Sequence, residues 1–342
     1  MKLLIITQKV DAHDHNLGFF VRWIETLAEH AGLIVIANEV GGHALESARV
    51  RVLSLGKERG VSRLQRFRRY RELLREHLPA SDGVFFHMCP EYVLAAGCLP
   101  KHYGKKTLLW YVHKQVSWRL RIAVMLVDKI FTASKESCRL RGRKIAVVGH
   151  GIDSNTNYEQ DTKLRKGTSA TPHLITGGRI SAVKDIATLL RGFRELQKSF
   201  PDAQFSIIGE PITNADRMYL QELQRIASDS VRFLGGVSHD ALPRLLREAT
   251  AFVHASRTGS TDKAVLEALA SGLPVLTSSE AFSEDIPGVI KFREGDPNDL
   301  AEKVALAFEN GRLGYNEKGR EWVKEHHDLN NLLKRIVDFY RA

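Results

Sequence analysis

Short apolar runs alternate with longer helical patterns along the whole chain, and this series occurs twice. Strands joined by crossover helices form parallel sheets with helices on both faces. The polar stretch 153–171, DSNTNYEQDTKLRKGTSAT, lacks periodicity and separates the two series. The alternation therefore predicts an α/β chain of two Rossmann-like, doubly wound domains that face a cleft.

The element boundaries follow from the apolar runs. In the first series we expect strands at 3–7, 33–37, 50–55, 83–87, 107–112, 129–133 and 145–149. In the second we expect strands at 173–177, 205–209, 231–235, 251–255 and 274–278, with helices near 184–198, 214–228, 239–248, 262–271, 297–309 and 313–325. The predicted domains are 1–155 and 172–325, joined by a connection at 156–171. A C-terminal helix is expected at 326–342, for which packing back on the first domain is one option.

Cysteine usage and the apolar runs restrict the class of protein. The three cysteines, Cys89, Cys98 and Cys138, form no CxxC pair, so neither a disulfide framework nor a zinc cage is indicated. The apolar run at the start is too short for a signal peptide, and no later run approaches the roughly 20 residues of a membrane span. We expect a cytoplasmic protein, with peripheral attachment to the cytoplasmic face of a membrane as an option.

The positive charge lies in the first half of the chain. The net charge is +10, and residues 1–165 hold 27 Lys and Arg against 16 Asp and Glu. The densest stretch is 62–78, where arginines interrupt an apolar stripe at helical spacing. Such a helix is either a solvated surface helix or a face held against anionic lipid headgroups. Nucleic acid is not expected as a partner, because no nucleic-acid-binding motif accompanies the charge.

The turns after the strands are the places to look for ligand-binding residues, because open α/β sheets bind ligands at the carboxyl ends of their strands. Neither a Walker A pattern nor GxGxxG occurs. The segment ITGGRISAVKD instead places Gly178 and Arg179 after a strand and Lys184 five residues later. Glycine allows close backbone approach, and the two cations suit a diphosphate. The alternative is a solvated helix start.

A second candidate segment is SRTGSTDKAVLEALASGLPVLTS, residues 256–278. Asp262 is a suitable N-cap for a helix through this apolar sequence. Glu267 is the carboxylate within the first turns of that helix. It either points to solvent or reaches a ligand at the helix start, where a carboxylate suits the vicinal hydroxyls of a ribose.

The second half resembles the nucleotide-sugar domain of the retaining GT-B glycosyltransferases, in particular glycosyltransferase family 4, known as group 1. Four pieces carry the resemblance in order: GGR-x4-K at 177–184, a strand ending at 209, VRFLGG through VHAS at 231–256, and VLEALASGLPVLTS at 265–278. Weaker pieces in the first half are NLGFFVRWIETLA, WYVHK, IFTASKES and VVGHGID.

The resemblance implies roles for individual residues. Arg179 and Lys184 match the basic pair that holds the donor diphosphate, Glu267 matches the acid that binds the donor ribose, and His113 matches the histidine that faces the reaction centre. The implied donor-binding set is Gly18, Gly178, Gly209, Gly259, Ser260, Asp262, Lys263 and Glu267. Residues expected on the acceptor side are Asn16, His87, Glu91 and Lys114.

The chain departs from the family at one position. Gly259, eight residues before Glu267, stands where the first acid of the family's E-x7-E motif belongs. Asp262 is a candidate replacement for that acid, with a helix cap as its alternative role. Lys263 is a candidate for an additional phosphate contact.

The resemblance implies a retaining transferase that moves a sugar from a UDP- or GDP-sugar to a hydroxyl acceptor. The expected acceptor is a glycan or a lipid-linked saccharide in cell-envelope polysaccharide synthesis. No cofactor and no metal are expected, because Arg179 and Lys184 supply the positive charge and no paired carboxylates of the DxD type occur. The alternatives are a non-catalytic nucleotide-sugar-binding protein of the same fold and a nucleotide-sugar 2-epimerase.

Overall fold

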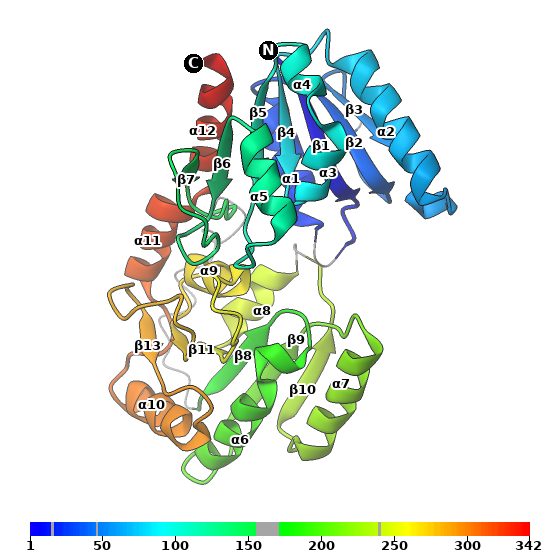
Figure 1. The fold of residues 1–342 in the computed structure, drawn as a ribbon. Coiled ribbons are helices and arrows are strands. Elements are labelled where there is room, and N and C mark those ends of the chain that lie inside the picture. Colours follow the sequence, from blue (N-terminus) through cyan, green and yellow to red (C-terminus); the bar gives the residue numbers. More distant parts are fainter. Residues whose placement is uncertain (15–16, 46, 155–170, 239–240) are drawn as a thin grey trace. The chain divides into compact units, whose positions relative to one another are not determined.

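The computed structural model describes residues 1–14, 17–45, 47–154, 171–238 and 241–342. The chain divides into two compact units, shown in Figure 1. Unit 1 comprises Met1–Gly151 and Leu329–Ala342, and unit 2 comprises Ile152–Asp328. The predicted connection at 156–171 lies outside the described residues except for Thr171.

The sheet of unit 1 is parallel throughout. Residues of β1 alternate between two cores, with Leu3 and Ile5 buried on one face and Leu4 and Ile6 on the other, so this stretch of the strand is apolar in every position. In the described residues the sheet has seven strands in the order β3-β2-β1-β4-β5-β6-β7. These are β1 (Lys2–Val10), β2 (Gly32–Val40), β3 (Val50–Ser54), β4 (Gly83–His87), β5 (Lys106–Trp110), β6 (Lys129–Thr132) and β7 (Ile145–Val147).

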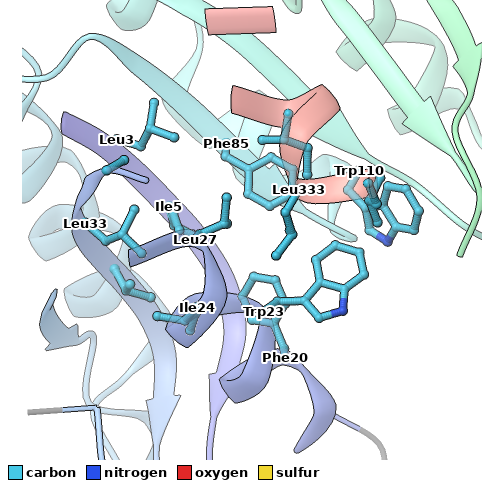
Figure 2. Packing of buried hydrophobic residues seen from close by; sticks show 14 of the residues in the cluster. Leu3, Ile5, Phe20, Trp23, Ile24, Leu27, Leu33, Phe85, Trp110 and Leu333 are labelled. Atoms are coloured by element: carbon cyan, nitrogen blue, oxygen red, sulfur yellow. The ribbon is translucent and has the colours of Figure 1, made fainter. Parts of the chain in front are cut away.

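Helices cover both faces of this sheet. Helices α1 and α12 pack on one face, and α2, α3 and α5 pack on the other. Figure 2 shows the first face, where Trp23 of α1 meets Trp110 of β5 with ring centroids 5.1 Å apart. The helices are α1 (Phe19–Ala28), α2 (Arg63–His77), α3 (Pro90–Ala96), α4 (Leu99–His102), α5 (Trp118–Leu126) and α12 (Leu329–Arg341).

Helix α12 belongs to unit 1 although it ends the chain. Leu333 lies beside Phe85 in the core (Figure 2). The hydroxyl of Tyr340 donates to the carbonyl of Val84 at 2.7 Å. A side chain at Gly83 would collide with the Tyr340 ring, since an added Cβ lies 2.3 Å from it. The C-terminal helix is therefore an integral part of the first core.

Unit 2 repeats the arrangement with a parallel sheet in the order β10-β9-β8-β11-β12-β13. Helices α6, α7 and α10 pack on one face, and α8, α9 and α11 pack on the other. The strands are β8 (His173–Gly177), β9 (Gln204–Ile208), β10 (Val231–Gly235), β11 (Ala251–His254), β12 (Val275–Thr277) and β13 (Val289–Lys291). The helices are α6 (Ile186–Leu196), α7 (Asn214–Ile226), α8 (Leu242–Glu248), α9 (Lys263–Ala270), α10 (Pro297–Glu309) and α11 (Glu317–His327).

The two sheets confirm the predicted pair of Rossmann-like folds. Each expected strand range contains a strand, and only β13 was not predicted among the strands of the described residues. Only two apolar residues, Val289 and Ile290, stand together in this strand, too few for an apolar run.

Candidate functional site

The strand order of unit 2 reverses between β8 and β11, the point at which open α/β sheets bind ligands. The chain moves outward from β8 through β9 to β10, and then returns to the other side of β8 as β11. The loops that follow β8 and β11 are joined directly, because Arg257 N–H donates to the carbonyl of Val183 at 2.9 Å. These two loops contain half of the predicted donor-binding set, namely Gly178, Gly259, Ser260 and Asp262.

Two glycines bring backbone segments close together at this edge. Gly178 and Gly209 have φ values of +129° and +137°, a region that side chains rarely adopt. A Cβ added to Gly209 would lie 1.8 Å from the carbonyl oxygen of Gly178. These two positions therefore require glycine for a structural reason.

Arg179 follows directly and is exposed at this edge. The nearby Asp216 carboxyl has a lowered pKa, through hydrogen bonds at Thr213 and then through the positive charge of Arg179. An exposed guanidinium at the carboxyl end of a strand can bind an anion without breaking a buried ion pair.

Lys184 is joined to Asp262 across the two loops. Its Nζ lies 2.8 Å from Oδ1 of Asp262, and the two side chains are 20% and 16% exposed. Asp262 is the N-cap residue of α9 by position, but its side chain makes no capping hydrogen bond. The predicted N-cap position is therefore confirmed, without a capping hydrogen bond from the side chain.

The second carboxylate oxygen of Asp262 contacts a buried histidine that the sequence did not single out. His254 Nε2 lies 2.6 Å from Oδ2 of Asp262, and His254 Nδ1 lies 2.9 Å from Oγ1 of Thr277. Burial alone would raise the pKa of the Asp262 carboxyl, but the His254 hydrogen bond and the charge of Lys184 hold it well below its usual range. Asp262 is therefore an anion between a cation and a histidine.

Glu267 lies on α9 and is buried, so the alternative that it points to solvent is wrong. Its Oε1 pairs with Lys263 Nζ at 2.9 Å, one helical turn away. Ahead of this helix, Gly259 has a φ of +60°, and Ser260 and Ser256 hydrogen bond to the hydroxyl of Thr258. The loop before α9 therefore offers hydroxyls where the resemblance would have placed an acid.

A further ion pair joins the same two loops. Arg257 donates to Asp185 at 2.6 Å and lies 3.7 Å from Glu294, so two carboxylates already balance its charge. Asp185 also accepts from Thr188 at 2.9 Å, at the start of α6. Sequence reasoning missed this pair, although Asp185 directly follows Lys184.

In unit 1 the predicted residues are placed very differently from one another. His113 is exposed beyond β5, where its Nδ1 accepts from Gln115 N–H at 3.1 Å, and Lys114 is half-buried beside it. Gly18 is buried at the start of α1, where an added Cβ would lie 2.5 Å from the carbonyl oxygen of Asp14. Asn16 lies outside the described residues.

His87 was predicted on the acceptor side, and this prediction is wrong. The side chain is 1% exposed and its ring stacks on Phe20 with centroids 3.7 Å apart. Its Nδ1 is 3.0 Å from Oγ1 of Thr7, and burial lowers its pKa to about 3. His87 is a neutral core residue that no acceptor can touch.

Unit 1 contains a pocket of about 470 Å³ that is lined from β1, β2, α2 and α3. Its walls include the predicted acceptor residue Glu91 together with aromatic, amide and cationic side chains from β1, β2, α2 and α3. They comprise Gln8, Asn38, Arg63, Arg66, Phe67, Tyr70 and Tyr92. Burial raises the pKa of Cys89, at the base of α3, to about 11, so its thiol is protonated at neutral pH. The pocket is suited to binding a ligand with rings and hydroxyl groups rather than to covalent chemistry.

Within the described residues, no three His, Cys, Asp or Glu side chains gather in a way that could hold a metal ion. In the same part of the chain no helix is both long and apolar enough to cross a bilayer.

Comparisons with known sequences match the part of the chain that contains these residues. Residues 171–310 match the family model described as "Glycosyl transferases group 1". A glycogen synthase of Mycobacterium tuberculosis is 27% identical over 171 residues, covering 49% of this chain and 40% of that protein. The alpha-monoglucosyldiacylglycerol synthase of Acholeplasma laidlawii is 32% identical over 124 residues, covering 34% and 30%. The mannosylfructose-phosphate synthase of Agrobacterium fabrum is 32% identical over 156 residues, covering 42% and 34%. The chain thus matches less than half the length of each of these relatives.

Solved structures share the fold over the full chain. The Anabaena protein HepE in complex with UDP superposes with a TM-score of 0.77 at 15% identity, covering 100% of both chains. The sucrose-phosphate synthase of Thermosynechococcus elongatus gives a TM-score of 0.75 at 16% identity, covering 99% of this chain and 98% of that one. At such identities the likeness establishes the fold, a pair of Rossmann-like domains of the GT-B class.

Proposed function

We propose that this chain, whose segment 171–310 belongs to the group 1 glycosyltransferases, transfers a sugar from a nucleoside-diphosphate sugar to a hydroxyl group of an acceptor. The observation that carries the proposal is the placement of Arg179, Lys184 and Glu267 at the switch point of the unit 2 sheet, inside that segment. Two cations and a buried carboxylate at one edge match the diphosphate and the ribose of a nucleotide.

These residues are proposed to stabilise the nucleoside diphosphate as it leaves the sugar. As the bond from the sugar to the diphosphate breaks, negative charge accumulates on the phosphate oxygens. Fixed cations stabilise such charge more in the transition state than in the substrate. We assign this role to Arg179 and Lys184, and the retaining course to attack from the face that the diphosphate leaves. His113 stays the proposed group that orients donor hydroxyls.

The acceptor is assigned to the pocket of unit 1. Aromatic rings of Phe67 and Tyr92 offer flat apolar surfaces for sugar rings, while Gln8 and Asn38 offer hydrogen bonds for hydroxyls. Tyr70 is held in place because its hydroxyl donates to the carbonyl of Tyr92 at 2.9 Å. We propose a saccharide acceptor, either a free glycan or a lipid-linked one of the kind used in envelope polysaccharide synthesis.

A calorimetric panel tests the proposed function. UDP, GDP and their glucose and mannose conjugates are titrated into the protein, and hydrolysis of the bound conjugate is followed without acceptor. We expect one nucleotide to bind and its conjugate to be hydrolysed slowly, with both signals unchanged by EDTA because Arg179 and Lys184 supply the positive charge. Recovery of a lost signal by Mg²⁺ or Mn²⁺ would contradict the metal independence, and absence of all binding would contradict the function.

Gly259 favours one alternative, a protein that binds nucleotide sugars without turnover, because an acid of the family's motif is absent there. The same panel separates the two functions. Binding of a nucleotide sugar with no hydrolysis and no transfer to any saccharide would favour the non-catalytic binder.

Glu267→Gln should weaken binding of the preferred nucleoside diphosphate about tenfold. An amide has one oxygen in place of a carboxylate's two charged ones, and a hydrogen bond to a charged group is worth roughly 1.5 kcal/mol or more. The 2′-deoxy form of the nucleotide should then lose no further affinity in the variant. Independent, additive losses would contradict a direct contact with the ribose. Glu302→Gln, on the exposed surface of α10, is the matched control.

We also propose that unit 1 contacts an anionic membrane surface through the outer face of α2 and α5. Apolar side chains stand exposed there, with Leu64 of α2 59% exposed and Trp118 and Met125 of α5 60% and 78% exposed. Helices α2, α3 and α5 cover the same face of the sheet (Figure 1). Exposed apolar residues interleaved with arginine are typical of surfaces that enter a lipid headgroup layer.

Not every arginine of α2 is available for lipid. Arg66 donates to Asn38 and to the carbonyl of Val61, Arg69 to the carbonyl of Ser54, and Arg71 to the carbonyls of Ala95 and Ala96. These three fasten the helix to the rest of unit 1. The arginines proposed to meet lipid are the exposed Arg63, Arg68 and Arg75.

Replacing Arg63, Arg68 and Arg75 by Gln should weaken binding to mixed phosphatidylglycerol–phosphatidylcholine vesicles by up to about 100-fold. Each cation near an anionic surface contributes about 1 kcal/mol, and salt screens it. The charge-matched control replaces Arg225, Arg312 and Lys318 of unit 2 by Gln and should bind like the wild type. Sedimentation with vesicles measures both. Equal binding by the two triple variants, or binding to pure phosphatidylcholine, would contradict the proposal.

A further inference from the structure

Asp262 was a candidate for the missing donor-sugar acid, but its surroundings suit a different task. Each of its carboxylate oxygens already has a protein partner, Oδ1 the ammonium of Lys184 at 2.8 Å and Oδ2 the ring of His254 at 2.6 Å. The carboxylate therefore lies between a proposed diphosphate ligand and a histidine that is 3% exposed.

The histidine is itself fixed by the next strand. β11 pairs with β12 in parallel register, which places His254 opposite Thr277. The hydroxyl oxygen of Thr277 accepts from Ser279 N–H at 3.1 Å and lies 2.9 Å from His254 Nδ1. When the hydroxyl proton points at Nδ1, the ring proton is on Nε2, the nitrogen that faces Asp262.

Charge supports this assignment of the ring proton. Burial lowers the pKa of His254 below its usual value in spite of the neighbouring carboxylate, so the imidazole is neutral at pH 7. A neutral ring with its proton on Nε2 donates one hydrogen bond to Asp262 and adds no charge to the site.

We propose that His254 is a positioning residue, which together with Thr277 fixes Asp262 so that this carboxylate holds the ammonium of Lys184 for the donor diphosphate. Lysine has a flexible four-carbon stem, and ordering it opposes binding. An ammonium anchored through one of its three protons is ordered before the ligand arrives and keeps two protons for phosphate oxygens. Asp262 then serves the diphosphate side of the donor rather than its sugar.

The proposal rests on the proposed function, so its test begins with the nucleotide, UDP or GDP, that the wild type binds. His254→Leu removes both ring hydrogen bonds without changing the net charge, and His254→Gln places an amide N–H near the position of Nε2. We expect the Leu variant to bind the nucleoside diphosphate and its glucose conjugate about tenfold more weakly, by the same factor, and the Gln variant to recover most of the loss.

A matched control lies in the same sheet. His173 begins β8, at the opposite edge, and its Nε2 and Nδ1 contact Ser206 Oγ and the carbonyl of Glu248, both at 2.9 Å. His173→Leu removes two hydrogen bonds of a partly buried histidine and should lower the melting temperature while leaving nucleotide affinity unchanged. Equal weakening by His173→Leu and His254→Leu would show a general loss of stability and overturn the proposal.

Two further outcomes decide whether His254 acts through Lys184. In a Lys184→Ala background His254→Leu should cause no additional loss, because the group it positions is gone. Additive losses would overturn the proposal. Weaker binding of the glucose conjugate with unchanged binding of the diphosphate would also overturn it, because Asp262 would then act on the sugar.

Nitrogen-15 NMR of the histidine rings provides a readout that needs no nucleotide. We expect His254 to be neutral with its proton on Nε2 in the free wild type, and Thr277→Val to disturb this tautomer. A charged His254 ring, or a ring proton on Nδ1, would overturn the proposal that His254 positions Asp262. A wild type that shows the expected tautomer but binds neither UDP nor GDP would instead overturn the proposed function, so the two failures are distinguishable.

Discussion

Replacing Arg179 by alanine should lower sugar-transfer turnover by two to three orders of magnitude. Removing one fixed donor from a developing anion has an effect of about that size in other enzymes. The side chain is exposed, so its loss should leave the fold unchanged. Because the interaction strengthens as the diphosphate departs, kcat should fall more than the affinity for the nucleotide sugar. Steady-state kinetics with the preferred donor, together with the melting temperature, measures both effects.

Lys184→Ala should show a loss of similar size, since it removes the second cation. Arg257→Ala is the matched control at the same edge, because two carboxylates, Asp185 and Glu294, balance the charge of Arg257, whereas Lys184 pairs with Asp262 alone among the described ion pairs. We expect this control to lose less than about tenfold in turnover. Near wild-type turnover of Arg179→Ala would refute the proposal that Arg179 binds the diphosphate. An equal loss of turnover in all three variants would also contradict specific roles of Arg179 and Lys184, because any lost positive charge at this edge would then have the same effect.

Most strands could be predicted from the sequence because they carry an apolar run that is buried in the sheet, whereas β3, β7 and β10 are only partly buried. LLII at 3–6 alternates between two cores, so a run without polar interruption indicates a strand covered on both faces. β13 has only two adjacent apolar residues, Val289 and Ile290, too few for such a signal. The packing partner of the C-terminal helix could not be derived, because periodicity shows that a helix has an apolar face and not what covers it.

The site could be predicted to the extent that a motif identifies it. Arg179, Lys184 and Glu267 follow from spacing and resemblance, whereas the contacts of Asp262 depend on strand pairing. Only the register of β11 with β12 brings His254 to Thr277, and no local pattern encodes that register. The prediction for His87 failed because a polar residue at a strand end is typical of a ligand-binding group. The sequence does not show that Phe20 stacks on its ring.

Ending the chain at Asp328 should leave unit 1 unfolded and unit 2 folded. The truncation removes α12, whose Leu332, Leu333 and Ile336 are fully buried in the core of unit 1. Burying one such side chain contributes about 1.5–3 kcal/mol, and Val337 and Tyr340 add to the three. The sum is about the whole stability of a typical domain, roughly 5–15 kcal/mol. The exposed core would also bind hydrophobic dyes.

Unit 2 should survive because its two cores contain no residue after Val323. Its chain ends are also fastened to each other, since Ile152 N–H donates to the carbonyl of His327 at 2.7 Å and Ser154 donates to Asp328 at 2.5 Å. Limited proteolysis with mass spectrometry should therefore give a resistant fragment near 152–328 and rapid cleavage within 1–151. Tyr340→Phe, which removes only the hydrogen bond to Val84, is the mild control and should cost about 1 kcal/mol. Equal protease resistance of both units after truncation would refute the proposal that the core of unit 1 requires α12.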